Sequence, residues 1–268
     1  MKKQTISEKD LIQFLDEKVV QYNRPFFIET DPISIPHKFS RKEDIEIAGF
    51  FTATISWGQR PVILRNANIL MEIMDHSPFE FVLTSSSNEI KQMNKFVHRT
   101  FNSTDAKFFV LALRNIYKNH GGLENIFTNS LNNFIPEDQL ISPMQNAISE
   151  FRKIFLLQKH DSRSEKHISD PMKNSSAKRI NMFLRWMVRQ DKVGVDFGIW
   201  KNISPSLLQI PLDLHVGNVA RKLGLLKRTQ SDWKAVAELT AKLRTFDDKD
   251  PVKYDFALFG LGIFEGFH

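Results

Sequence analysis

The segment 177–189, AKRINMFLRWMVR, carries the first residues whose types and spacing could do chemistry. Its apolar residues recur at helical spacing and predict one buried stripe, formed by Ile180, Phe183, Leu184, Met187 and Val188. The neighbouring ridge of the same helix carries Lys178, Met182, Arg185 and Arg189. Three cations on one ridge usually form a solvated face. The functional interpretation is a ridge that faces phosphates, with one lysine at an active site.

A second candidate is Asp213 in the segment 210–216, IPLDLHV. It stands directly before a predicted helix whose buried face includes Val216 and Val219. An aspartate in this position is a good N-cap, so its role could be structural alone. The positive end of a helix also holds a carboxylate in a fixed, ionised state, which would suit a catalytic group at the mouth of a cleft. The two interpretations are compatible.

These two segments resemble parts of the helix-hairpin-helix DNA glycosylases. IPLDLHVGNVARKLGL is similar to the segment in which that superfamily carries its catalytic aspartate, matched here by Asp213. Bifunctional members also have a nucleophilic lysine upstream, matched by Lys178, 35 residues before Asp213. This spacing is nearer to the archaeal 8-oxoguanine glycosylases than to the endonuclease III relatives. AKRINMFLRWMVR, VDFGIW, IPLDLHV and DPVKYDFALFGLG resemble recurrent segments of an uncharacterised bacterial family related to those archaeal enzymes.

The resemblance implies a base-excision repair DNA glycosylase for an oxidised purine such as 8-oxoguanine. A Schiff base on Lys178 would add AP lyase activity, with Asp213 as the catalytic carboxylate. The implied partner is double-stranded DNA that contains a damaged base, bound by a monomer without metal or other cofactor. The alternatives are a non-catalytic DNA-binding module with the same fold and a helical protein–protein scaffold without a nucleic-acid role.

The resemblance also implies contacts to the DNA. The first core helix of the superfamily resembles the segment GFFTATISWGQRPVILRNANILM. In that superfamily, the loop after this helix fills the hole left by an extruded base. The Leu-Pro-Gly-x-Gly hairpin of the superfamily is absent, and Gly194 and Gly198 are the substitute turn positions. The predicted DNA contacts are Gln59, Arg185, Arg189, Gly194, Arg221 and Lys222, with Lys227 and Arg228 as further phosphate contacts.

Four side chains are candidates for a pocket around the extruded base: Trp57, Phe197, Trp200 and His215. Aromatic residues in a helical protein more often belong to the core, and a histidine beside a helix cap is more often structural. The histidines show no pair at helical spacing, so a zinc site is not predicted.

The elements that must position these residues are predicted to be helices throughout. Signals for helix starts occur at Ser7, in the capping-box pattern Ser40–Glu43, and at Pro61, Ser103, Pro143 and Asp250. Residues 24–39 contain three prolines and predict an extended connector, and the polar residues 84–90 predict a loop. No segment shows the alternation of a sheet strand. We therefore expect an all-α protein of the helix-hairpin-helix glycosylase type.

Composition is compatible with such a protein. The chain has 268 residues, no cysteine and a net charge of +6, and no apolar run approaches the length of a membrane span. We expect two helical lobes, 1–158 and 177–268, joined by a flexible surface loop at 159–176. The N-terminal residues either stay with the first lobe or return to the second. The expected location is the cytoplasm, in association with the bacterial nucleoid.

Overall fold

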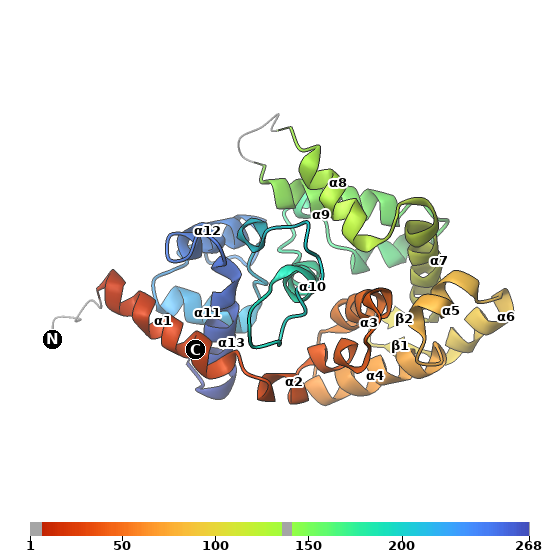
Figure 1. Ribbon diagram of the computed structural model, residues 1–268, viewed down its shortest axis with the longest axis horizontal. Coiled ribbons are helices and arrows are strands. Elements are labelled where there is room, and N and C mark those ends of the chain that lie inside the picture. Colours follow the sequence, from red (N-terminus) through yellow and green to blue (C-terminus); the bar gives the residue numbers. More distant parts are fainter. Residues whose placement is uncertain (1–6, 136–140, 268) are drawn as a thin grey trace.

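A computed structural model describes residues 7–135 and 141–267, in which helices surround a central helix, α10 (Figure 1). One group, α1 and α11 to α13, lies to one side of α10, and α3 to α7 lie to the other. The predicted all-α class is confirmed. The helices are α1 (Glu8–Tyr22), α2 (Phe26–Thr30), α3 (Lys42–Ile55), α4 (Arg60–Ile73), α5 (Pro78–Thr84), α6 (Ser87–Ile90), α7 (Ser103–Asn119), α8 (Leu123–Asn132), α9 (Pro143–Phe155), α10 (Lys178–Val188), α11 (Leu214–Lys222), α12 (Trp233–Arg244) and α13 (Tyr254–Phe264).

Short 3-10 turns connect many of these helices, and one small hairpin is present. The turns are η1 (Pro32–Ser34), η2 (Pro36–Lys38), η3 (Lys91–Lys95), η4 (Ser162–His167), η5 (Pro171–Lys173), η6 (Pro205–Leu207) and η7 (Pro251–Lys253). The hairpin pairs β1 (Val97–His98) with β2 (Phe101–Asn102) in antiparallel register. Strands of this length are too short to produce an alternating pattern in the sequence. No helix within 7–135 and 141–267 combines the length and apolarity needed to cross a membrane.

The N-terminal helix packs against the C-terminal helix, so the chain closes on itself (Figure 1). Tyr22 of α1 stacks on Phe264 with ring centroids 5.5 Å apart, and Lys18 forms an ion pair of 2.6 Å with Glu265. A Cβ atom on Gly260 would lie 2.2 Å from the Tyr22 ring, so the close approach of α1 and α13 requires glycine there. The N-terminal residues therefore return to the C-terminal group of helices.

The interface between α10 and α3 forms the centre of the core. Phe183 of α10 meets Phe50 of α3 edge to face, with ring centroids 5.5 Å apart. Phe50 also contacts Phe109 and Phe151 at 5.7 Å and 5.6 Å, which ties α7 and α9 to the same cluster. The apolar stripe predicted on α10 is therefore buried.

Residues 159–176 are not the free surface loop that the sequence predicts. They contain η4 and η5, and the Ser164 side chain is fully buried. The Ser164 hydroxyl donates a 2.6 Å hydrogen bond to Asp105 on α7, and Arg163 pairs with the same carboxylate at 2.8 Å. The polar composition of the segment is explained by these bonds with a buried aspartate, which a sequence pattern cannot distinguish from exposure to water.

Several local predictions also need correction. Residues 24–39 form α2, η1 and η2, and residues 87–90 form α6. The Ser40–Glu43 pattern does not form a capping box, because α3 begins after Arg41. Asp250 does not cap η7; it accepts a hydrogen bond from Arg189 instead. The predicted starts at Ser7, Pro61, Ser103 and Pro143 agree with α1, α4, α7 and α9.

Candidate active site

The structure brings Lys178 and Asp213 together. Lys178 is the first residue of α10, and Asp213 is the N-cap of α11. The Lys178 Nζ atom lies 3.4 Å from Asp213 Oδ2, and the two side chains are 32% and 14% exposed. An amine and a carboxylate at the starts of two different helices therefore meet at a site that solvent can reach.

The two oxygens of Asp213 have different partners. Oδ1 accepts a 2.8 Å hydrogen bond from the Val216 amide, as expected of an N-cap, while Oδ2 faces Lys178. Leu212 and Val216 on either side are buried and anchor this part of the chain. The cap thus fixes the direction of the carboxylate, so the structural and the chemical interpretations of Asp213 hold together.

A narrow pocket adjoins this pair. Its apolar walls include Phe27 of α2 and Phe259 of α13, whose rings contact each other edge to face at 6.1 Å. A base stacked between these two rings would have to separate them. Three carboxyl groups and two cations lie among the lining residues, so the pocket is not predominantly basic. The lining residues are Phe27, Asp31, Lys178, Met182, Arg185, Pro211, Asp213, Asp255 and Phe259.

The comparisons with known proteins identify a family. A family model described as "Protein of unknown function (DUF2400)" matches residues 31–264, which include every residue that lines the pocket except Phe27. The chain belongs to this family. The comparison with curated proteins and the comparison with solved structures gave no match.

Two carboxylates of this DUF2400 pocket were missed by sequence reasoning. Asp31 lies in the segment predicted as a connector, and burial raises the pKa of its carboxyl. Asp255 lies in the first turn of α13, and burial raises its pKa to about 7. The signal for Asp255 was available, because it is the single acid within the apolar run 254–264. An acid at such a position implies a buried partner or a function.

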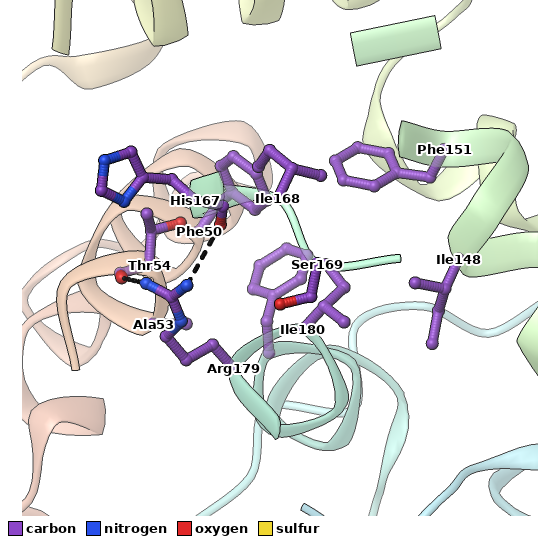
Figure 2. Close-up of a pocket in the computed structure, with 11 residues that line it drawn as sticks. Phe50, Ala53, Thr54, Ile148, Phe151, His167, Ile168, Ser169, Arg179 and Ile180 are labelled. Atoms are coloured by element: carbon purple, nitrogen blue, oxygen red, sulfur yellow. Dashed lines mark hydrogen bonds between the residues drawn. The ribbon is translucent and has the colours of Figure 1, made fainter. Parts of the chain in front are cut away.

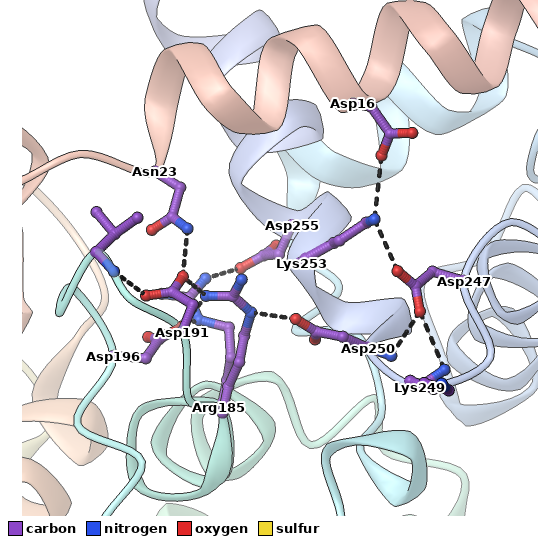
Figure 3. A network of polar contacts seen from close by, with 12 residues as sticks. Asp16, Asn23, Arg185, Asp191, Asp196, Asp247, Lys249, Asp250, Lys253 and Asp255 are labelled. Carbon is purple, nitrogen blue, oxygen red and sulfur yellow. Dashed lines mark hydrogen bonds and ion pairs between the residues drawn. The ribbon is translucent and has the colours of Figure 1, made fainter.

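The cations further along α10 are not available to DNA. Arg185 and Arg189 are 4% and 3% exposed, and both pair with Asp196. Figure 3 shows Arg185 among the aspartates of this network. Arg185 also pairs with Asp255, and Arg189 with Asp250 at 2.9 Å. Burial opposes the charge of Arg189, but the surrounding carboxylates still raise its pKa. The predicted phosphate contacts at these two positions are therefore wrong.

The other predicted DNA contacts differ in their surroundings. The amide of Gly194 already donates to Asp191 at 3.1 Å, so the predicted phosphate turn is occupied. Arg221 is half-buried and donates from Nε to the Arg228 carbonyl at 2.8 Å. Lys222 is exposed on α11 beside the ring of Phe267, and Gln59 is the exposed N-cap of α4.

None of the four predicted base-pocket residues lines this pocket. Trp200 is in the core, where its indole donates a 2.6 Å hydrogen bond to Glu46. Phe197 stacks on His37 with ring centroids 4.2 Å apart. Trp57 packs against two histidines, and His215 faces α13 near Gly262. The aromatic residues that line the pocket are Phe27 of α2 and Phe259 of α13.

Arg179, the neighbour of Lys178, points to a second, more enclosed cavity (Figure 2). Its guanidinium donates to the Thr54 carbonyl at the end of α3 at 2.5 Å and lies 4.9 Å from the Trp57 ring. Burial lowers its pKa to about 10. Arg179 therefore fixes the turn between α3 and α4 that carries Gln59, while Lys178 faces the candidate site.

Proposed function

We propose that this protein is a base-excision DNA glycosylase with AP lyase activity, acting on an oxidised purine such as 8-oxoguanine. The observation that carries the proposal is the 3.4 Å approach of Lys178 Nζ to Asp213 Oδ2 beside a pocket with aromatic walls. Lys178 and Asp213 are also the two residues that the resemblance to the helix-hairpin-helix glycosylases identifies as catalytic. The finer assignment of the fold to that type is part of the same proposal.

The proposed reaction begins with extrusion of the damaged nucleotide, because its glycosidic bond is inaccessible within a duplex. The neutral amine of Lys178 attacks the sugar C1′ and displaces the base. Asp213 Oδ2 is placed to stabilise the positive charge that develops on the sugar and to accept a proton from the amine. Collapse to a Schiff base then permits β-elimination of the strand.

The pocket supports an oxidised purine through its acceptors. Asp31 Oδ1 accepts a 3.1 Å hydrogen bond from the Ile33 amide, and within the described part of the chain its Oδ2 makes no hydrogen bond. An ionised carboxylate oxygen only accepts hydrogen bonds. 8-Oxoguanine has an N–H group at ring position 7, where guanine has an acceptor. Ionised Asp31 would accept a hydrogen bond from this N–H group. Because burial raises the pKa of Asp31, this preference for the oxidised base should increase with pH.

The test is covalent trapping. Incubation of the protein with an 8-oxoguanine duplex and borohydride should produce a protein–DNA adduct, because borohydride reduces the Schiff base. Lys178→Gln should abolish the adduct, since an amide cannot form an imine, and should leave duplex binding largely intact. Lys173→Gln is the matched control, because Lys173 is an exposed lysine of the neighbouring turn η5 that does not line the pocket.

Each outcome has a definite meaning. An adduct that persists in Lys178→Gln would show that another amine is the nucleophile. Salt-dependent duplex binding without base release from any oxidised, alkylated or deaminated duplex would favour the non-catalytic DNA-binding module. The absence of duplex binding even at low salt would favour the protein–protein scaffold.

A further inference from the structure

Asp255 belongs to two parts of the molecule at once. Its carboxyl lines the candidate pocket together with Lys178 and Asp213. Its Oδ2 also accepts a hydrogen bond from Arg185, which connects it to the buried polar network between α10, α13 and the loop after α10 (Figure 3). Asp255 is 5% exposed.

The buried network holds more carboxylates than cations. Its two guanidiniums belong to Arg185 and Arg189, and they share four carboxylates. These carboxylates belong to Asp191, Asp196, Asp250 and Asp255. Asp196 and Asp255 are the most buried of the four, with side chains 0% and 8% exposed, so full ionisation would place an excess of negative charge in a largely buried network, which is unfavourable. The network therefore favours a bound proton, and Asp255 is the carboxylate among these four that lines the pocket.

Some groups around Asp255 raise the pKa of its carboxyl, and others lower it. Burial raises its pKa to about 7, and Asp213 and Asp196 add to the rise. Arg185 and Lys178 oppose it. Asp31 faces the same pocket from the start of η1. At neutral pH Asp255 thus holds its proton in a substantial fraction of molecules, and the pocket around it carries two further carboxylates.

We propose that Asp255 donates a proton to the departing base, an inference that rests on the proposed glycosylase function. The neutral Lys178 amine forms a bond to C1′, and the C1′–N9 bond breaks with its electron pair going to the purine. The purine takes the Asp255 proton and leaves neutral. The products are a carboxylate at Asp255 and a secondary ammonium at Lys178, which loses its proton to Asp213 or water.

The charge of the pocket supplies the reason for this step. A purine that left as an anion would be held beside Asp213, whose carboxylate belongs to the same lining. Like charges in a partly buried site repel strongly. Protonation during bond cleavage removes this repulsion, and general acids contribute on the order of 10²–10⁴-fold to such reactions.

The experiment measures single-turnover release of 8-oxoguanine against pH. The wild-type rate should fall as the pH rises above about 7, because the acid must be protonated. Asp255→Asn should be slower by on the order of 10²–10⁴-fold and should lose this falling limb, since an amide cannot transfer the proton. Asp250→Asn is the matched control: Asp250 pairs with Arg189 in the same network but does not line the pocket. Its pH profile should keep the falling limb.

A second measurement separates this role from a structural one. A duplex with an abasic site has no base to release, so Asp255→Asn should form the borohydride adduct with it as efficiently as the wild type. A falling limb that persists in Asp255→Asn, or an equal loss of adduct with the abasic duplex, would overturn the proposal. Wild-type protein that traps no adduct and releases no base would overturn the proposed function as well.

Discussion

The two ends of one ridge on α10 have opposite environments. At its start, Lys178 is about one-third exposed and forms an ion pair with Asp213 at 3.4 Å. Two and three turns later, Arg185 and Arg189 are almost completely buried and share four carboxylates. Cations at helical spacing on one ridge thus face a solvent-accessible pocket at one end and form an internal ion network at the other.

This difference teaches how a cationic ridge should be interpreted. A buried cation with several carboxylate partners is committed to the fold, because removal of one partner leaves unpaired charge in the interior. A cation that is partly exposed and has one partner can change its partner when a substrate arrives. Exposure and the number of partners, rather than charge and spacing, distinguish Lys178 from Arg185.

The largest expected effect is on stability at the buried end. Arg185→Met removes the cation paired with Asp255 and one of the two cations paired with Asp196, and should lower the free energy of unfolding by about 3–5 kcal/mol. Lys178→Met should cost less than about 1 kcal/mol, because partly exposed ion pairs contribute little. Urea unfolding of both variants and the wild type measures the contrast. Equal losses for the two variants would remove the distinction between the ends of the ridge.

The next effect concerns Asp255, which joins the two ends. Burial raises its pKa to about 7, so between about pH 4 and 7 the folded state binds more protons than the unfolded state. The contribution of this group to stability should therefore fall as the pH rises through that range. Asp255→Asn should remove the contribution, so its stability relative to the wild type should increase with pH. Unfolding curves at several pH values test the sign, and a difference that decreases with pH would contradict it.

A smaller effect is expected at the pocket end. Asp213→Ala should lower stability by about 1 kcal/mol through loss of the α11 cap. Asp213→Asn should cost less, because asparagine caps equally well, but it should slow base release strongly because it removes the charge beside Lys178. Stability and base-release rates of both variants separate the cap from the chemistry. A wild-type rate in the Asp213→Asn variant would limit Asp213 to its structural role.

The smallest effect concerns the outer surface. Lys222 is exposed on α11, the helix that Asp213 caps, so we expect it to contact a phosphate. Lys222→Ala should reduce the slope of log affinity against log salt by about 0.9. Arg189→Ala should leave this slope unchanged in protein that remains folded, because Arg189 is buried. Lys118→Ala on α7 is the exposed control. Binding titrations at several salt concentrations measure all three slopes.

Local rules predicted much of the fold because their causes are local. Ser7 caps α1, and the prolines at positions 61 and 143 lie in the first turns of α4 and α9, as their fixed backbone angles suggest. The failures occurred where tertiary partners decide. The polar segment 159–176 packs on α7 through Asp105, and the proline-rich segment 24–39 folds into short turns that border the pocket.

The sequence by itself determined the helical class, the buried stripe of α10 and the position of Asp213 at the start of a helix, since each follows from spacing within a few residues. Only the tertiary structure decided which cations are buried with acids and which face a pocket. It also decided that Asp31, Asp255, Phe27 and Phe259 join Lys178 there. These residues come from α2, the start of η1, α10 and α13, which are far apart in the chain, and no local pattern encodes contacts at that separation.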